Sequence, residues 1–255
     1  MNHLPDAAEV LVMGASGGIG LEFCRQLLAQ PQVSRVWAGA RRPDAEGLAA
    51  LAEAHPDRLQ TLAVDVTSEA DIAAAAERIG AGTPRLHLVV NAFGLLHDED
   101  RGIWPEKRLE DVRLESLEAS FRVNAFAPIL IARHLLPLLT HRERAVYASL
   151  SARVGSIGDN RLGGWYAYRA AKAAQNMFTR GLAVELGRRA RQVICLALHP
   201  GTTDTPLSQP FQARVPEGKL FSTEYAVGCL LAVIDGAGRE DSGRFFGWDG
   251  EEVPW

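Results

Sequence analysis

The fold of this chain is decided by one stretch near its N-terminus, Val10-Leu11-Val12-Met13-Gly14-Ala15-Ser16-Gly17-Gly18-Ile19-Gly20. It begins with a short run that is apolar throughout, which is typical of a strand covered on both faces. The glycines allow a tight turn and a close approach of the backbone to a ligand. The helical pattern that follows points free N–H groups and a positive dipole end back at this turn. We therefore predict a pyrophosphate site formed by Gly14, Ser16, Gly17, Gly18, Ile19 and Gly20.

The same order of strand and helix repeats along the whole chain. Apolar runs predict strands at 9–13, 35–40, 59–64, 86–91, 145–150, 193–199 and 244–246. Helical patterns lie between them, at 19–29, 46–54, 69–79, 117–139, 165–187 and 223–234. We therefore predict an α/β fold over residues 1–255, a single-domain Rossmann-type doubly wound parallel sheet with helices on both faces. In such sheets ligands bind beyond the carboxyl ends of the strands.

Composition excludes several classes of function. The 255 residues carry a net charge of −4, which argues against a broad surface for nucleic acid. No apolar run is long enough to span a bilayer, and the N-terminus has no secretory pattern. The cysteines Cys24, Cys195 and Cys229 lie far apart, without metal-ligand spacing. We interpret the loop 97–100, His-Asp-Glu-Asp, as a solvated turn and not as a metal site. A cytoplasmic protein without metal, membrane or nucleic-acid partner is expected.

The end of the second strand indicates which dinucleotide would bind. An enzyme that uses NAD usually has a carboxylate here, which binds the ribose 2′-hydroxyl. This chain has none, and Arg41 and Arg42 follow the strand instead. A guanidinium group pairs well with the charge of a 2′-phosphate. The two arginines therefore predict NADP(H) as the cofactor.

Tyr168 and Lys172 form the clearest pair of candidate catalytic residues. They stand four residues apart in a predicted helix and so share one of its faces. An isolated tyrosine, with a pKa of about 10, is a poor acid–base catalyst at neutral pH. A lysine ammonium and a nicotinamide cation would both favour the phenolate and lower that pKa. The pair predicts proton transfer by Tyr168, with Lys172 also able to hold the ribose of the cofactor.

The order of these motifs resembles the short-chain dehydrogenase/reductase family over nearly the whole chain. The resemblance is carried by the glycine turn, Asn91-Ala92, Asn124, a serine-containing fifth strand, Tyr168/Lys172 and Pro200-Gly201. Within the family, residues 149–160 and 163–168 resemble a branch close to the bacterial C-factor proteins and the insect sniffer carbonyl reductases. The resemblance implies a Rossmann fold, a nicotinamide cofactor and a small carbonyl or alcohol substrate.

The resemblance also implies further site residues. Adenine would be contacted by Asp65 and Val66. Asn124, at an irregular point in a helix, would hold a water that links Lys172 to solvent. The cofactor would be lined by Asn91, Ala92, Phe93 and Gly94, where Phe93 displaces a glycine that the family usually has. The carboxamide end of nicotinamide would be held by Pro200, Gly201, Thr203 and Thr205.

The catalytic serine departs from the family pattern. It usually lies three residues before a glycine, here Gly155, and that position is Ala152. Ser151 is the neighbour of this alanine, and Ser149 lies on the same strand face if the strand continues. We predict that Ser151 supplies the hydroxyl. The alternatives are another group, such as Ser156, and a weakened polarisation of the substrate carbonyl.

Two functions follow from these observations. The first is an NADP(H)-dependent oxidoreductase that interconverts a carbonyl and an alcohol by hydride transfer. The alternative is a cofactor-binding regulatory or signalling protein that resembles C-factor and has little turnover. We also expect a homodimer or homotetramer, because the helices 117–139 and 165–187 are apolar on more than one side. The segment 206–221 is predicted as a substrate lid, and the aromatic C-terminus 245–255 is expected to pack on a neighbour or over the pocket.

Overall fold

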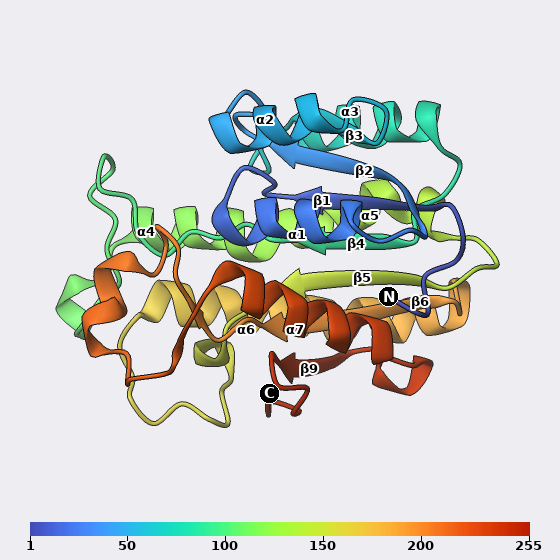
Figure 1. Cartoon of the computed structure of the whole chain (residues 1–255). Coiled ribbons are helices and arrows are strands. Elements are labelled where there is room, and N and C mark those ends of the chain that lie inside the picture. Colours follow the sequence, from blue (N-terminus) through green and yellow to red (C-terminus); the bar gives the residue numbers. More distant parts are fainter.

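One parallel sheet organises the molecule. The computed structural model describes all residues from 1 to 255 and contains a seven-stranded sheet in the order β3-β2-β1-β4-β5-β6-β9 (Figure 1). Its strands are β1 (Ala8–Met13), β2 (Val33–Ala40), β3 (Leu59–Ala63), β4 (Leu88–Asn91), β5 (Ala145–Leu150), β6 (Val193–His199) and β9 (Arg244–Gly247). Every neighbouring pair is parallel, and the order reverses between β1 and β4. The predicted doubly wound α/β fold is confirmed, and each predicted strand is present with its ends within two residues.

Helices cover both faces of this sheet. They are α1 (Gly18–Leu28), α2 (Glu46–Ala54), α3 (Glu69–Gly82), α4 (Leu114–Phe121), α5 (Ala127–Leu139), α6 (Tyr166–Arg189) and α7 (Thr223–Gly236). Two of them begin at a serine that caps the first turn: Ser68 accepts a hydrogen bond from the N–H of Asp71, and Ser222 accepts one from Tyr225. No helix is both long enough and apolar enough to cross a membrane.

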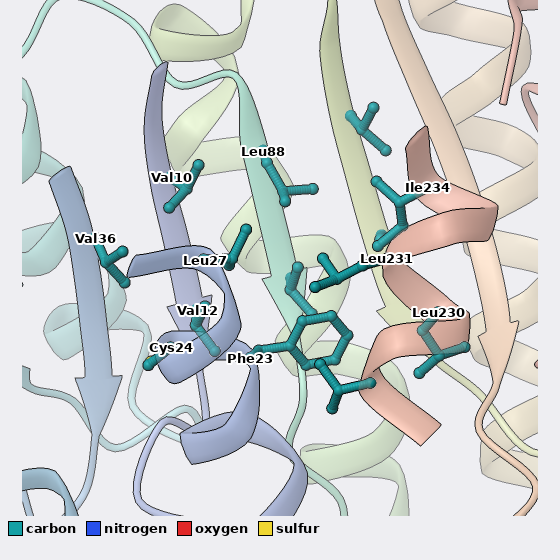
Figure 2. Close-up of a cluster of buried hydrophobic side chains, with 14 of the residues drawn as sticks. Val10, Val12, Phe23, Cys24, Leu27, Val36, Leu88, Leu230, Leu231 and Ile234 are labelled. Carbon is teal, nitrogen blue, oxygen red and sulfur yellow. The ribbon is translucent and has the colours of Figure 1, made fainter. Parts of the chain in front are cut away.

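The hydrophobic core lies in two layers, one on each side of the sheet. One cluster of 29 buried residues joins the strands to α1, α2 and α7, and another of 23 joins them to α3, α5 and α6. Figure 2 shows part of the first layer, where Phe23 and Leu27 of α1 and Leu230 of α7 pack onto the strands. Because both faces of the central strands are buried, these strands are largely apolar, with exceptions such as Glu9 in β1 and Ser149 in β5.

The predicted helix 117–139 is wrong in one respect, because it consists of three pieces. A π-helical turn, η2 (Arg122–Phe126), separates α4 from α5. Pro128 lies four residues after Asn124 and has no N–H, so it cannot donate the usual α-helical bond to the carbonyl of Asn124. The irregularity that the family resemblance implied at Asn124 is therefore present.

The carboxyl ends of the strands meet the longest connections at one edge of the sheet. In Figure 1 the arrowheads point to this edge, where the β4–α4 connection, the turn before α6 and the segment before α7 gather. That last segment is closed at its base by a second, two-stranded sheet, β7 (Thr202–Thr203) with β8 (Leu220–Phe221). Between β7 and β8 lies a short 3-10 helix, η4 (Gln209–Arg214).

The aromatic C-terminus packs on its own chain. Trp255 stacks on Phe245 of β9, with ring centroids 5.8 Å apart. Trp248 lies 4.5 Å from the ring of Phe221 and 5.8 Å from that of Tyr225. The tail therefore covers the sheet edge at β9 and contacts the base of the 206–221 segment.

Candidate active site

The glycine turn after β1 is shaped by close backbone contacts. Gly14 has a φ of +87°, and a Cβ there would lie 2.9 Å from the N of Phe93. A Cβ on Gly20 would lie only 2.1 Å from the carbonyl oxygen of Gly14, so α1 can begin this close to β1 only with glycine there. Gly17 precedes the helix and caps it with no side chain. Ser16 and Gly17 are exposed, which leaves the positive end of α1 accessible to an anion.

A second segment reaches this turn from the far end of the chain. A Cβ on Gly18 would lie 3.1 Å from the methyl carbon of Thr205 and 3.4 Å from that of Thr223. Thr205 belongs to the predicted nicotinamide segment, so the structure brings two of the predicted binding segments together. Thr223, the first residue of α7, was not predicted. Its only signal in the sequence is its position after Ser222, a helix cap.

Arg41 and Arg42 lie beyond the carboxyl end of β2. Both side chains are exposed, and neither forms an ion pair or a hydrogen bond within the chain. Asp65 follows β3, and one of its carboxylate oxygens accepts from the N–H and the hydroxyl of Thr67, each at 2.8 Å. The neighbouring Val66 packs against the core. These residues stand at successive strand ends on one side of the glycine turn, with the guanidinium groups free to bind a phosphate.

Tyr168 and Lys172 lie on one face of α6, as the spacing predicted. The Nζ of Lys172 is 5.7 Å from the ring centroid of Tyr168, and both side chains are buried. In the chain without a bound cofactor, burial raises the pKa of Tyr168, because the phenolate would lose its hydration. The lowering of this pKa by Lys172 and a nicotinamide cation together stays a prediction. Burial also lowers the pKa of Lys172 to about 7, because the ammonium form is penalised.

Lys172 is held by groups around the end of β5. Its Nζ donates to the carbonyl of Leu150 at 2.7 Å and to the side-chain oxygen of Gln175 at 3.0 Å. Gly155 lets the helix approach this strand end, since a Cβ there would lie 2.7 Å from the Cβ of Lys172. Gln175 was not predicted. The signal available was its place three residues after Lys172, on the same helix face.

The three candidate serines all have partners in the structure. Ser149 accepts a hydrogen bond from the amide of Asn91 at 3.0 Å, and Ser156 accepts one from the N–H of Asp159 at 3.1 Å. The hydroxyl of Ser151 donates to the side-chain oxygen of Asn176 at 2.6 Å. The Tyr168 hydroxyl makes no hydrogen bond within the chain. The choice of Ser151 as the carbonyl-polarising group therefore stays a prediction, and it requires this hydroxyl to exchange Asn176 for a substrate.

The residues after β4 divide into two groups. The side chain of Asn91 is buried and holds β5 through Ser149, while Ala92, Phe93 and Gly94 are partly exposed beyond the strand end. A Cβ on Gly94 would lie 3.3 Å from the side-chain oxygen of Asn124 and 4.0 Å from the Nζ of Lys172. Asn124 is also bonded to the backbone of Leu95 in both directions, at 3.0 and 2.8 Å. Asn124, Gly94 and Lys172 thus meet in one place.

The segment after β6 forms a turn in which side-chain hydroxyl groups bond nearby backbone carbonyls. Gly201 has a φ of +74° and lies against the ring of Phe221. Ser208 donates to the carbonyl of Thr203 at 2.6 Å, and the hydroxyl of Thr205 reaches the same carbonyl at 3.4 Å. Pro200 and Thr203 are joined by a hydrogen bond of 3.3 Å. This places the predicted nicotinamide-binding residues of the segment on one compact turn.

Aromatic rings from three connections stand above Tyr168. Trp165 lies 6.4 Å from the ring of Tyr168 and 5.0 Å from that of Phe211 in η4. Phe211 lies 6.0 Å from His97, which stacks on Trp104 at 5.3 Å. The segment predicted as a lid contributes Phe211 to this group of four rings beside Tyr168. Together they give the substrate side of the site an apolar wall.

Comparisons with known proteins agree with this geometry. A family model described as short chain dehydrogenase matches residues 8–215. The chain belongs to the short-chain dehydrogenase family. The NADPH-bound carbonyl reductase from chicken fatty liver is 29% identical, and the two chains align over 99% and 100% of their lengths with a TM-score of 0.87. The carbonyl reductase Sniffer of Drosophila melanogaster is 25% identical over 98% of this chain and 100% of its own, with a TM-score of 0.85.

A further relative of this short-chain dehydrogenase is the C-signal of Myxococcus xanthus. It is 36% identical over 154 residues, which are 60% of this chain and 86% of that protein. The Sniffer and C-signal matches confirm the branch that the sequence resembled within the family.

One cluster in this short-chain dehydrogenase has the composition of a metal site but lies at the opposite edge of the sheet. Ligand atoms of His87, His141 and Glu143 lie within 4.8 Å of one another, before β4 and β5. His87 accepts from the N–H of Glu9 and faces Glu143 with its other ring nitrogen, at 2.7 Å. His141 bonds the carbonyl of Leu86 and the N–H of Glu143. Since all four ring nitrogens have partners, we interpret the cluster as structural.

Proposed function

We propose that this short-chain dehydrogenase is an NADP(H)-dependent oxidoreductase that interconverts a carbonyl and an alcohol, with Tyr168 as the general acid or base. The observation that carries the proposal is the pair of Tyr168 and Lys172 on α6. The Nζ of Lys172 lies 5.7 Å from the centroid of the tyrosine ring and 4.0 Å from the Cβ position of Gly94. Gly94 follows β4, the strand beside the glycine turn. A proton donor therefore stands at the sheet edge where the dinucleotide of a Rossmann fold binds.

The residues present fit NADP(H). Gly14 and Gly20 form a cradle that any side chain would fill, and the uncapped start of α1 faces it. Arg41 and Arg42 are free to bind the 2′-phosphate. The chicken carbonyl reductase, 29% identical, is NADPH-bound, and this supports the same cofactor here. When bound, its nicotinamide supplies or accepts the hydride.

The chain's own residues would manage the proton and the oxygen. Since burial raises the pKa of Tyr168, its phenol is protonated at neutral pH and can give that proton to a substrate oxygen during reduction. In its ammonium form Lys172 would hold the ribose of the cofactor with its third N–H, because two of its donors are already bonded to Leu150 and Gln175. Ser151 would polarise the carbonyl, and Asn124 would hold the water behind Lys172. The aromatic wall excludes bulk water from the reacting groups.

A regulatory or signalling function is the second candidate, and two observations favour it. Ala152 stands where the family usually has its catalytic serine. The C-signal of Myxococcus xanthus is also a relative at 36% identity. In this case the chain would bind NADP(H) and turn over little or no carbonyl. A cytoplasmic location and a homodimer or homotetramer are part of both proposals.

The two candidates differ in one measurement. Purified protein is mixed with NADPH and a panel of aldehydes and ketones, and the loss of NADPH absorbance is followed. Under the first proposal at least one carbonyl is reduced, and Tyr168→Phe abolishes this turnover while NADPH binding stays nearly intact. Tight NADPH binding without any turnover across the panel would favour the second. Substantial turnover by Tyr168→Phe would contradict the role of this tyrosine.

A further inference from the structure

The chain enters α6 through an unusual turn. Gly163, Gly164 and Trp165 follow one another with φ values of +64°, +64° and +50°, all in the left-handed region. Such a conformation is unfavourable for a tryptophan and must be held by its surroundings. Tyr168 lies only three residues further on, so the geometry of this turn decides where its hydroxyl stands.

The start of α6 has no cap of its own. Trp165 occupies the N-cap position, and its side chain can accept no hydrogen bond from the first turn. In contrast, α3 and α7 begin at Ser68 and Ser222, which cap them locally. The free N–H groups at the start of α6 therefore need an acceptor from elsewhere in the chain.

Glu106 supplies that acceptor from the β4–α4 connection. Its carboxylate accepts from the N–H of Ala167 at 3.2 Å, although the two residues are 61 positions apart. Its backbone carbonyl accepts from the N–H of Trp165 at 2.5 Å. The same carbonyl lies 3.1 Å from the Cβ position of Gly164, so the contact also explains a glycine there. Glu106 thus bonds two N–H groups at the start of α6, those of Trp165 and Ala167, and packs closely against Gly164.

The burial of Glu106 shows that this contact is specific. The residue is 3% exposed, whereas its neighbour Lys107 is exposed. A carboxylate is seldom buried without a partner, and the positive end of a helix is a favourable one. Glu106 and Tyr168 also line the same small cavity, together with Ser116 and Ser120. Glu106 therefore borders the cavity beside Tyr168 as well as the turn that carries this tyrosine.

We propose that Glu106 is a positioning residue, which caps α6 from a distance and thereby fixes Tyr168 for proton transfer. The proposal rests on the proposed function of Tyr168. The role needs a hydrogen-bond acceptor and does not need a negative charge. Glutamine has an acceptor oxygen at the same distance from the backbone, so Glu106→Gln should preserve the cap, whereas Glu106→Ala should remove it.

Two measurements on the full-length protein test this role. The first is hydrogen–deuterium exchange of peptides that cover the first turn of α6. We expect Glu106→Ala to speed the exchange of the amides at 165–167 by about tenfold, and Glu106→Gln to leave it near that of the parent protein. Glu110→Ala is the matched control, since Glu110 is exposed on the same connection and its side chain makes no hydrogen bond. This measurement does not depend on turnover.

The second measurement is steady-state kinetics with NADPH and a confirmed carbonyl. We expect Glu106→Ala to lower kcat by about tenfold or more with little change in the KM for NADPH, because a displaced tyrosine weakens the transition state and not cofactor binding. Glu106→Gln should keep kcat within about threefold of the parent. NADPH binding stoichiometry measured by fluorescence separates this effect from a loss of folded protein.

The possible outcomes are distinct. If the hydrogen–deuterium exchange of the amides at 165–167 is unchanged in Glu106→Ala, the proposal that Glu106 caps α6 is overturned. Faster exchange with unchanged kcat would overturn the positioning role, and equal loss of kcat in Glu106→Gln and Glu106→Ala would show that the charge matters instead. A parent protein that reduces no carbonyl would refute the proposed function, and the exchange measurement would still decide whether Glu106 holds the turn.

Discussion

Gly155 is the position at which a single methyl group should disturb the candidate site most selectively. A Cβ there would lie 2.7 Å from the Cβ of Lys172 and 3.0 Å from its carbonyl carbon, where ordinary contacts begin at 3.4 Å. In Gly155→Ala, α6 must therefore withdraw from the end of β5 by about 0.7 Å. The Lys172–Leu150 hydrogen bond, now 2.7 Å, would lengthen by a similar amount.

The expected cost has two parts. Forcing an extra methyl group into a packed contact usually costs about 1–3 kcal/mol. Weakening a buried hydrogen bond adds about 0.5–1.5 kcal/mol. We expect the free energy of unfolding to fall by about 2–3 kcal/mol. We also expect kcat to fall by about tenfold or more, because displacement of Lys172 would displace the cofactor ribose that it holds under the proposed function.

Urea unfolding followed by circular dichroism measures the stability, and NADPH oxidation at low denaturant measures kcat. The matched control is Gly187→Ala on the same helix, where a Cβ would meet open space on a face away from Met177. It should raise the free energy of unfolding by about 0.5–1 kcal/mol, because alanine favours a helix more than glycine does, and it should leave kcat unchanged. A Gly155→Ala variant with the urea midpoint and kcat of the parent would refute the close contact between α6 and the β5 end.

Three further predictions concern cofactor, chemistry and assembly. NADPH should bind at least tenfold more tightly than NADH, which corresponds to a difference in binding free energy of about 1.4 kcal/mol. Fluorescence titration should show that an Arg41→Ala, Arg42→Ala double variant loses this preference. Equal affinities for the two cofactors in the parent protein would exclude the arginines as the 2′-phosphate site. Ser151→Ala should lower kcat by about 10²-fold, the effect of losing one positioned hydrogen-bond donor to the carbonyl oxygen. If Ser151→Ala leaves kcat unchanged and Ser156→Ala lowers it, Ser156 and not Ser151 polarises the carbonyl. Light scattering at micromolar concentration should give the mass of at least a dimer. Met177→Arg should give a monomer, because this apolar side chain is 71% exposed on α6, one of the helices expected to pair between subunits. A monomeric parent protein would contradict the expected assembly.

The fold could be predicted because its signals are local and repeated. Each parallel strand is buried on both faces, so runs such as the one before Gly14 are apolar throughout and differ from the helices between them. The site residues at strand ends followed from the same reasoning, since the carboxyl ends of parallel strands share one edge. The Tyr168–Lys172 spacing is also local, because it depends only on the helical repeat.

The features that could not be predicted depend on contacts between distant segments. Nothing near Glu106 shows that its carboxylate meets Ala167, because the contact exists only once α4 and α6 have packed. The partner of Ser151 could not be foreseen for the same reason, since Asn176 belongs to another element. The sequence predicts that this helix starts at Trp165. In the structure α6 starts one residue later, with Trp165 in the left-handed conformation. Two preceding glycines were the only local signal of this turn.

The small ladder between β7 and β8 has a consequence for engineering. It joins both ends of the lid at neighbouring positions, Thr202–Thr203 and Leu220–Phe221, and neither strand belongs to the seven-stranded sheet. The part of the chain between them that follows Thr205, the predicted nicotinamide contact, can therefore be treated as a replaceable segment whose ends lie close together on a hydrogen-bonded base. We expect segments of other lengths and compositions to be accepted between these two strands without a change in the register of any strand in the main sheet.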